Sequence, residues 1–329
     1  MGDGEFQLRW GIVGTGQIAT AFVRDLRRHG TGRSIIAAVL SRSRARAEVF
    51  GCDCGVPSDK CFVDFDQFLA SGVDVCYIAS PHTAHVEQAL RCLSGGVSVL
   101  VEKPLALSKS DAERVFRVAR ENGLFAMEAL WTRFLPAMEA VCACIQSGEI
   151  GTLMSIDTDF GFDGANGPPR LTDPALGGGS LFDVASYALH LPTLFLPEDK
   201  KALAPKILHT ESKNQANGVD DSFRALLCYS SEVENLMLSF RTSIVENTSQ
   251  TAVIRGSQGV CVIEAPFGGP DSFHIDGKRD SVAKTGHGLH YQVREVERCM
   301  QSGMLESSRV PWKESISWAG VLENLGSLR

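Results

Sequence analysis

Short hydrophobic runs alternate with amphipathic stretches over the first 130 residues of the chain. In the stretch after the first run, Ile18, Phe22 and Leu26 recur at four-residue steps, which is the spacing of a helix with one buried face. Strands and helices in this alternation predict a parallel sheet with helices on both faces. The predicted strands are 8–14, 34–41, 73–80, 97–103 and 124–130.

The pattern changes after residue 130. A helix is predicted over 131–151, where apolar residues again recur at four-residue steps, and a late helix over 290–303. Most hydrophobic runs between them are joined by turns, which predicts a large, mainly antiparallel open sheet in an α+β domain. These strands are predicted at 154–162, 223–231, 234–243, 251–257 and 260–266. We therefore predict an α/β protein with one domain over 1–130 and a second, substrate-binding and dimerisation domain over 131–329.

The composition argues against several classes of function. The 329 residues carry a formal net charge of −7, which disfavours nucleic acid as a partner. No hydrophobic run approaches the roughly 20 residues of a membrane-spanning helix, and the N-terminus lacks the pattern of a signal peptide. The ten cysteines include no C-x-x-C pair and fit neither a zinc site nor a disulfide framework. We expect free thiols, no metal and a cytoplasmic location.

A glycine-rich turn separates the first predicted strand from the first predicted helix. Residues 14–19 read GTGQIA, the G-x-G-x-x-A pattern of a dinucleotide-binding turn. In such a turn the first glycine allows the tight bend, the second lets the backbone approach a pyrophosphate, and the helix N-terminus faces the phosphates. The first domain is therefore predicted to be a Rossmann domain. Its candidate cofactor contacts here are Gly14, Thr15, Gly16, Gln17 and Ile18.

The end of the second predicted strand indicates which cofactor is bound. A site that prefers NAD usually places an acidic residue here, which accepts from the ribose 2′-hydroxyl. Residues 41–46 read SRSRAR and contain no acid. Ser41 and Arg42, with support from Arg46, are suited to a 2′-phosphate instead, so NADP(H) is the predicted cofactor.

Four longer motifs accompany the glycine-rich turn. They are SPHTAHVEQAL (80–90), VLVEKPLALS (99–108), FAMEALWTRFLPA (125–137) and GGGSLFDVASYALH (177–190). Together they resemble the Gfo/Idh/MocA oxidoreductase family and, within it, the branch of the dihydrodiol and D-xylose dehydrogenases. The resemblance implies a Rossmann domain followed by a domain whose open sheet often forms a dimer interface, so a homodimer is expected. It also implies a cis bond between Lys103 and Pro104.

Hydride transfer at a carbinol carbon needs a group that takes the hydroxyl proton, and Lys103, Asp183 and Tyr187 are the candidates. Asp183 and Tyr187 are four residues apart, so a helix would place both on one face. Because a nearby ammonium group favours the phenolate form of a tyrosine, Tyr187 is expected to transfer the proton. Lys103 is then its electrostatic partner, and Asp183 orients the substrate or Lys103. Direct contact between Lys103 and the substrate hydroxyl is the alternative.

Further candidates line the cofactor and the substrate. The loop of His82 and His85 follows the third predicted strand, and the resemblance places it beside the nicotinamide ribose, with helix capping as the alternative for His85. The complete set expected beside the cofactor in this part of the chain is Ser80, His82, His85, Glu102 and Lys103. The candidates for the substrate pocket are Trp131, Arg133, Phe160 and Arg170, with a place in the core as the alternative for Trp131 and fixing its own loop as the alternative for Arg170.

These residues predict NADP(H)-dependent hydride transfer between nicotinamide and a small sugar, a polyol or a trans-dihydrodiol. Reduction of a keto-sugar, such as anhydrofructose or a 3-keto-sugar, is the alternative among enzymes. A nucleotide-sensing regulator without catalysis is the alternative from another class, and the presence of Lys103, Asp183 and Tyr187 argues against it.

Overall fold

The computed structural model describes residues 6–197, 204–230 and 235–329. Two compact units make up the chain, of which the first comprises 1–106, 111–131 and 285–312, and the second 107–110, 132–284 and 313–329. The predicted border after residue 130 falls beside the change of unit after Trp131. The predicted strands 223–231 and 234–243 each include one residue, 231 and 234, that lies outside the described residues.

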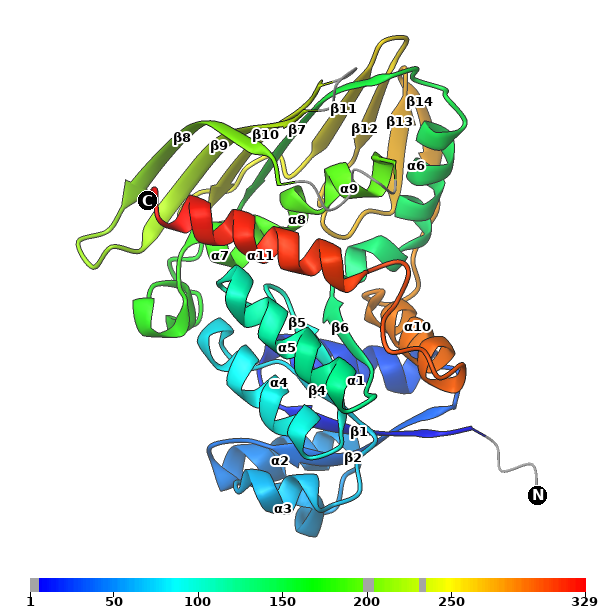
Figure 1. Cartoon of the computed structure of the whole chain (residues 1–329), viewed down its shortest axis with the longest axis vertical. Coiled ribbons are helices and arrows are strands. Elements are labelled where there is room, and N and C mark those ends of the chain that lie inside the picture. The colour runs from blue at the N-terminus through cyan, green and yellow to red at the C-terminus, as the bar shows by residue number, and fades with distance from the viewer. Residues whose placement is uncertain (1–5, 198–203, 231–234) are drawn as a thin grey trace. The chain divides into compact units, whose positions relative to one another are not determined.

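The first unit is built on a six-stranded sheet in the order β3-β2-β1-β4-β5-β6 (Figure 1). All its strand pairs are parallel, and α4 and α5 lie on one face with α1 on the other, which confirms the predicted Rossmann domain. The sequence pattern does not predict β3, whose two residues are too few to show a period. The strands are β1 (Leu8–Val13), β2 (Ser34–Leu40), β3 (Cys61–Phe62), β4 (Val75–Ile78), β5 (Ser98–Glu102) and β6 (Ala126–Ala129). The helices are α1 (Gln17–His29), α2 (Arg44–Cys54), α3 (Phe65–Leu69), α4 (His85–Ser94), α5 (Lys109–Glu121) and α10 (Leu289–Gln301).

The segment Thr285–Trp312 belongs to the first unit, although the predicted border places it in the second domain. Asp25 of α1 is buried and accepts two backbone N–H groups at and just before the start of α10, at 2.8 and 2.9 Å. At the far end of the segment, the indole N–H of Trp312 donates to the carbonyl of Ala126 in β6 at 2.8 Å. These contacts join residues far apart in the chain, and the hydrophobic pattern alone does not reveal them.

The second unit holds an eight-stranded sheet in the order β14-β13-β12-β11-β7-β10-β9-β8. Neighbouring strands are antiparallel except β7 and β10, so the predicted mainly antiparallel sheet is confirmed. The pattern does not predict β8 and β14, which are edge strands with polar, largely exposed side chains, or the short strand β13. The strands are β7 (Leu153–Gly161), β8 (Lys206–Asn214), β9 (Asp220–Ser230), β10 (Asn235–Ser243), β11 (Ala252–Gly256), β12 (Val260–Ile263), β13 (Ser272–Ile275) and β14 (Lys278–Ser281).

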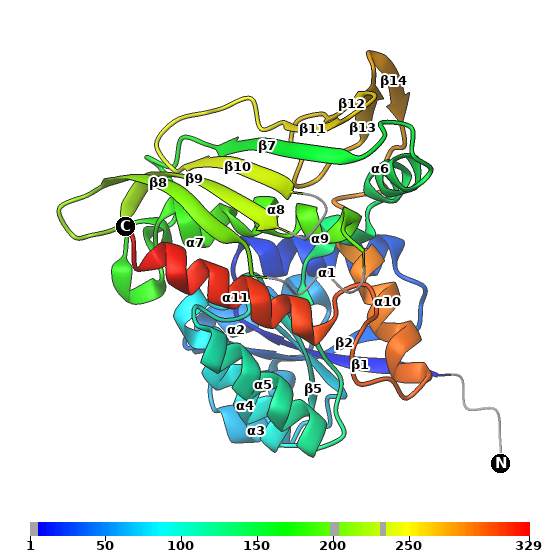
Figure 2. The same cartoon turned by 45° about the horizontal axis from the view of Figure 1, so that its top comes forward.

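Helices cover one face of this second sheet. Figure 2 shows α7, α8 and α9 on the same side of the sheet, and no helix of the described residues covers the opposite face. The helix predicted over 131–151 is shorter in the structure, where a 3₁₀ turn spans Trp131–Phe134 and α6 spans Pro136–Gln146. Proline is favoured at the first position of a helix, which agrees with the start of α6 at Pro136. The helices are α6 (Pro136–Gln146), α7 (Ser180–Val184), α8 (Ser186–Leu189), α9 (Leu191–Phe195) and α11 (Trp312–Gly326). Across both units, no described helix has the length and the apolar character that crossing a membrane requires.

Candidate active site

The glycine-rich turn lies at the carboxyl end of β1, where it opens α1. Gly14 has a φ of +100°, and a Cβ there would lie 2.7 Å from the carbonyl oxygen of Ala79, so only glycine fits. A Cβ on Gly16 would meet open space, which leaves the start of α1 accessible to a ligand. This geometry suits the pyrophosphate of a dinucleotide at a helix N-terminus.

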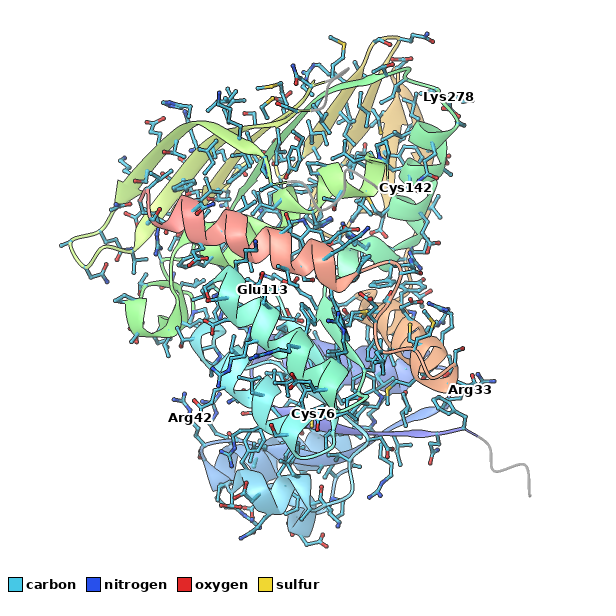
Figure 3. All side chains as sticks on the ribbon, in the orientation of Figure 1. Arg33, Arg42, Cys76, Glu113, Cys142 and Lys278 are labelled. Carbon is cyan, nitrogen blue, oxygen red and sulfur yellow. The ribbon has the colours of Figure 1, made fainter. Side chains whose placement is uncertain are left out.

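The three residues predicted to bind a 2′-phosphate, Ser41, Arg42 and Arg46, follow β2. Ser41 is half-buried, with its hydroxyl 3.4 Å from that of Thr15 in the glycine-rich turn. Arg42 and Arg46 are exposed, and Arg42 is labelled in Figure 3. Arg44, in contrast, is held by Glu48 at 2.7 Å and by the carbonyl of Cys61 at 2.7 Å. The guanidinium groups on either side of Arg44 are therefore the ones available to an anion.

His85 joins the loops that follow β4 and β5. Its ring is buried, with Nδ1 2.9 Å from the carbonyl oxygen of Pro104 and Nε2 2.9 Å from the carbonyl oxygen of Ser80. His82 is also buried and lies edge-on to His85, with 5.8 Å between the ring centroids. The structure thus makes His85 a link between two strand-end loops, and its contact with a cofactor stays a prediction.

Two buried carboxylates hold the backbone around Lys103. Glu102 accepts the Tyr77 hydroxyl at 2.5 Å and the backbone N–H of Lys103 at 3.3 Å. Glu128 accepts the backbone N–H of Leu105 at 2.9 Å. The Lys103–Pro104 bond is cis, as the resemblance implies. Lys103 therefore leaves the end of β5 from a backbone that hydrogen bonds fix on both sides.

Asp183 and Tyr187 lie on two consecutive short helices of the second unit, α7 and α8, rather than on one continuous helix. Asp183 is buried, and its carboxylate accepts from the guanidinium of Arg170 at 2.7 Å. The half-buried ring of Tyr187 stacks on Phe160, with 5.1 Å between centroids and 12° between planes. The structure therefore brings two of the predicted substrate residues, Arg170 and Phe160, into contact with the predicted catalytic pair.

The remaining two pocket candidates are placed differently. Trp131 is half-buried in the 3₁₀ turn after β6 and belongs to the first unit. Arg133 is only 4% exposed, and its guanidinium donates to Glu314 at 2.8 Å, to the carbonyl of His190 at 3.1 Å and to Thr193. These contacts hold Arg133 in the interior of the second unit, and its place at the substrate stays a prediction.

The same buried cluster affects a histidine beside the candidate catalytic pair. Burial and, to a smaller extent, the charge of Arg133 hold the pKa of His190 well below its ordinary value. His190 is therefore neutral at physiological pH, and it contributes no charge to the site.

Sequence reasoning missed Gly268, which packs against the site. A Cβ at this position would lie 2.9 Å from Phe160 Cε2 and 3.0 Å from Tyr187 Cδ1, both ring atoms of the stacked pair. The hydroxyl of Thr132 donates to the carbonyl of Gly268 at 2.5 Å and holds it in place. In the sequence, the run FGGP at 267–270 indicates only a turn, so no local signal links it to Tyr187.

Two family models match successive parts of the chain. Residues 8–130 match the family model described as an oxidoreductase family with an NAD-binding Rossmann fold, and residues 138–262 match the GFO/IDH/MocA C-terminal domain. The chain belongs to the Gfo/Idh/MocA oxidoreductase family, as its motifs predict, and its first unit is an NAD(P)-binding Rossmann domain.

Among its relatives are the trans-1,2-dihydrobenzene-1,2-diol dehydrogenases of Mus musculus and Homo sapiens. The mouse protein is 32% identical over 96% of this chain and 95% of its own length, and the human protein is 30% identical over 97% and 96%. Two solved structures share the fold at lower identity. One is KijD10, a 3-ketoreductase from Actinomadura kijaniata in complex with NADP and TDP-benzene, at 23% identity, TM-score 0.83 and coverage of 98% and 97%. The other is an aldose-aldose oxidoreductase from Caulobacter crescentus complexed with glycerol, at 21% identity, TM-score 0.84 and coverage of 97% and 96%.

Replacing Gly268 with alanine is predicted to displace the stacked rings of Phe160 and Tyr187. Overpacking of this kind lowers the free energy of unfolding by about 1–3 kcal/mol, which urea unfolding followed by tryptophan fluorescence measures. Nitration of Tyr187 by tetranitromethane, quantified by mass spectrometry, is expected to become faster. Gly320→Ala is the matched control, because a Cβ there meets nothing closer than 3.4 Å. Unchanged stability together with unchanged nitration in Gly268→Ala would contradict this account of the packing.

Proposed function

We propose that this protein is an NADP(H)-dependent oxidoreductase that moves a hydride between nicotinamide and a carbinol or carbonyl carbon of a small sugar, polyol or trans-dihydrodiol. The observation that carries the proposal is the arrangement in the second unit, where Asp183 pairs with Arg170 at 2.7 Å and Tyr187 stacks on Phe160. Oxidation of a carbinol needs a group that takes the hydroxyl proton, a role that the Tyr187 phenol suits, while the Asp183 carboxylate and the Phe160 ring suit orientation of the substrate.

The cofactor assignment is supported by charge at the end of β2. Within the described parts of the chain, neither Arg42 nor Arg46 forms an ion pair, whereas Arg44 between them is committed to Glu48. Two exposed guanidinium groups beside Ser41 suit the dianionic 2′-phosphate of NADP(H), and residues 41–46 hold no carboxylate that would repel it.

The chemistry divides between the cofactor and the side chains. When bound, the nicotinamide supplies or accepts the hydride, that is, both electrons of the reaction. Tyr187 takes the hydroxyl proton during oxidation and returns it during reduction, and the ammonium group of Lys103 favours the phenolate form of Tyr187. Asp183, already oriented by Arg170, orients the substrate hydroxyl or Lys103. The proposal requires Lys103 and Tyr187 to act on the same substrate.

The substrate class is supported by the relatives and by the aromatic pair. The mouse and human relatives are dehydrogenases of a cyclic vicinal diol. The Phe160–Tyr187 stack presents flat apolar rings, which suit an unsaturated ring or the apolar face of a sugar. A panel of trans-dihydrodiols, aldoses and keto-sugars, each assayed with NADP(H) and NAD(H), tests this assignment.

Replacing Tyr187 with phenylalanine is predicted to lower kcat by roughly 10²–10⁴-fold, the usual contribution of a general acid–base group. The dissociation constant of NADPH should stay unchanged, because the cofactor residues belong to the first unit. Steady-state kinetics on the active substrate and fluorescence titration of NADPH measure both. Tyr229→Phe is the control, since Tyr229 is a buried tyrosine of the same unit and its pKa is raised by burial. A Tyr187→Phe enzyme with more than half the wild-type turnover would refute the role given to Tyr187.

Replacing Arg42 with alanine is predicted to weaken NADPH binding roughly ten- to hundredfold, which corresponds to the loss of one charge-assisted hydrogen bond. NADH binding should not change, because NADH lacks the 2′-phosphate. Parallel fluorescence titrations give the dissociation constants of NADPH and NADH for the variant and the wild type. Arg44→Ala serves as the control, since its guanidinium pairs with Glu48. Equal effects on NADPH and NADH would assign Arg42 to another role.

We propose that the uncovered face of the second sheet binds a second copy of this chain. Register places Leu226, Ser239, Asp157, Val253 and Val262 in one row across the five strands from β9 to β12. The apolar members of this row are only half-buried. Leu226, Val253 and Val262 are the apolar side chains of this row, and Asp157 between them pairs with Arg255 at 2.6 Å. Half-buried apolar side chains on a face that no described helix covers suit a two-fold symmetric interface.

Replacing Val253 with aspartate is predicted to convert a dimer into a monomer, because each copy would then bury an unpaired charge in the interface. Sedimentation velocity at micromolar concentration measures the change in mass. Val49→Asp on α2 is the control, since Val49 is 66% exposed in the first unit. A Val253→Asp protein that keeps the mass of the wild type would place the interface elsewhere.

A further inference from the structure

A fully buried carboxylate lies at the start of α7, the helix that carries Asp183. Asp220, the first residue of β9, has 0% of its surface exposed. Its Oδ2 accepts from the hydroxyl of Ser180 and from the backbone N–H of Leu181, each at 2.7 Å. Asp220 therefore satisfies a backbone group at the N-terminal end of a helix of only five residues.

Arg329 supplies the opposite charge. Its guanidinium donates to Asp220 Oδ1 at 2.9 Å, and the same guanidinium lies 4.3 Å from the ring centroid of Phe182. Phe182 directly precedes Asp183 in α7. Arg329 thus reaches α7 twice, once through Asp220 and once through the aromatic ring.

The packing around this ion pair leaves no spare room. A Cβ on Gly179, the residue before α7, would overlap Asp220 Oδ1 and lie 3.2 Å from the guanidinium of Arg329. Gly179 has a φ of +116°, which a side chain would strain in any case. The last glycine of the GGG motif therefore allows the ion pair to approach the backbone from which α7 begins.

We propose that Arg329 is a positioning residue, which holds α7 through Asp220 and so sets the position of Asp183. Removing Arg329 would leave a buried carboxylate without its counter-charge at the base of the helix, and a buried unpaired charge makes its surroundings rearrange. The backbone transmits such a shift, because the N–H of Asp183 donates to the carbonyl of Gly179 at 3.1 Å. This inference rests on the proposed function, in which Asp183 and Tyr187 act on the substrate.

The expected signature is a loss of turnover rather than of binding. The predicted cofactor residues belong to the first unit, whereas Arg329 and α7 belong to the second. The concentration of NADPH-binding sites, measured by titration, therefore gives the amount of folded enzyme even if α7 is displaced. Misplacement of a catalytic group by about 1 Å costs roughly 100-fold in rate. We expect Arg329→Gln to lower kcat per NADPH-binding site roughly ten- to hundredfold, with KM changed by less than about twofold.

The experiment compares four variants, Arg329→Gln, Arg329→Lys, Arg91→Gln and Tyr187→Phe, with the wild type on the active substrate of the panel. Arg329→Lys keeps the positive charge and should restore kcat per site to within about threefold of the wild type. Arg91→Gln is the matched control, because Arg91 also combines an ion pair, with Asp66 at 2.8 Å, and a contact over an aromatic ring, Phe65 at 4.1 Å. That pair belongs to the first unit and is exposed, so Arg91→Gln should leave kcat unchanged.

Two results would overturn the inference. One is a kcat per site for Arg329→Gln within about twofold of the wild type, and the other is an Arg329→Lys enzyme no better than Arg329→Gln. Tyr187→Phe in the same series separates this failure from a failure of the proposed function. If Tyr187→Phe loses turnover while Arg329→Gln keeps it, only the positioning role is wrong. If Tyr187→Phe keeps its turnover, the catalytic role that the proposed function gives to Tyr187 is wrong.

Discussion

The parallel pairing of β1 with β4 and of β4 with β5 is the constraint on which the chemistry of the first unit depends. Parallel strands end at the same edge of a sheet, so the turn at Gly14 and the loops of Ser80 and Lys103 share one edge. Because β4 and β5 are buried along their whole length, apolar burial stabilises the sheet without help from that edge. His85 then ties two of the loops together through the carbonyls of Ser80 and Pro104.

The second unit depends on contacts of another kind. Helix α7 has five residues, too few to be stable alone, so its position is decided by what it touches. Asp220 from β9 meets its first turn, and Arg170 from a preceding 3₁₀ turn pairs with Asp183. The aromatic stack of Tyr187 on Phe160 adds a contact with β7. Ion pairs and an aromatic stack therefore hold α7 and α8 together with the apolar side chains that α7 buries.

The sequence predicted the elements whose signals are local. The alternation of runs predicted the Rossmann sheet, and the glycine-rich turn lies where the pattern placed it, at the end of β1. Local patterns do not show a residue's partner when that partner is distant in the chain. Arg133 follows a strand end, as a pocket residue would, yet it pairs with Glu314, 181 positions away. The segment Thr285–Trp312 joins the first unit through Asp25, more than 250 positions earlier in the chain.

The sequence by itself determined the class of fold, the dinucleotide turn and the identities of the candidate catalytic side chains, because strand alternation, helical spacing and short motifs are properties of neighbouring residues. Only the tertiary structure decided which of those side chains share a neighbourhood. It paired Arg170 with Asp183 and Arg133 with Glu314, and it packed Gly268 against Tyr187. The physical reason is that ion pairs and ring contacts depend on where distant segments cross, and no local period in the chain encodes that crossing.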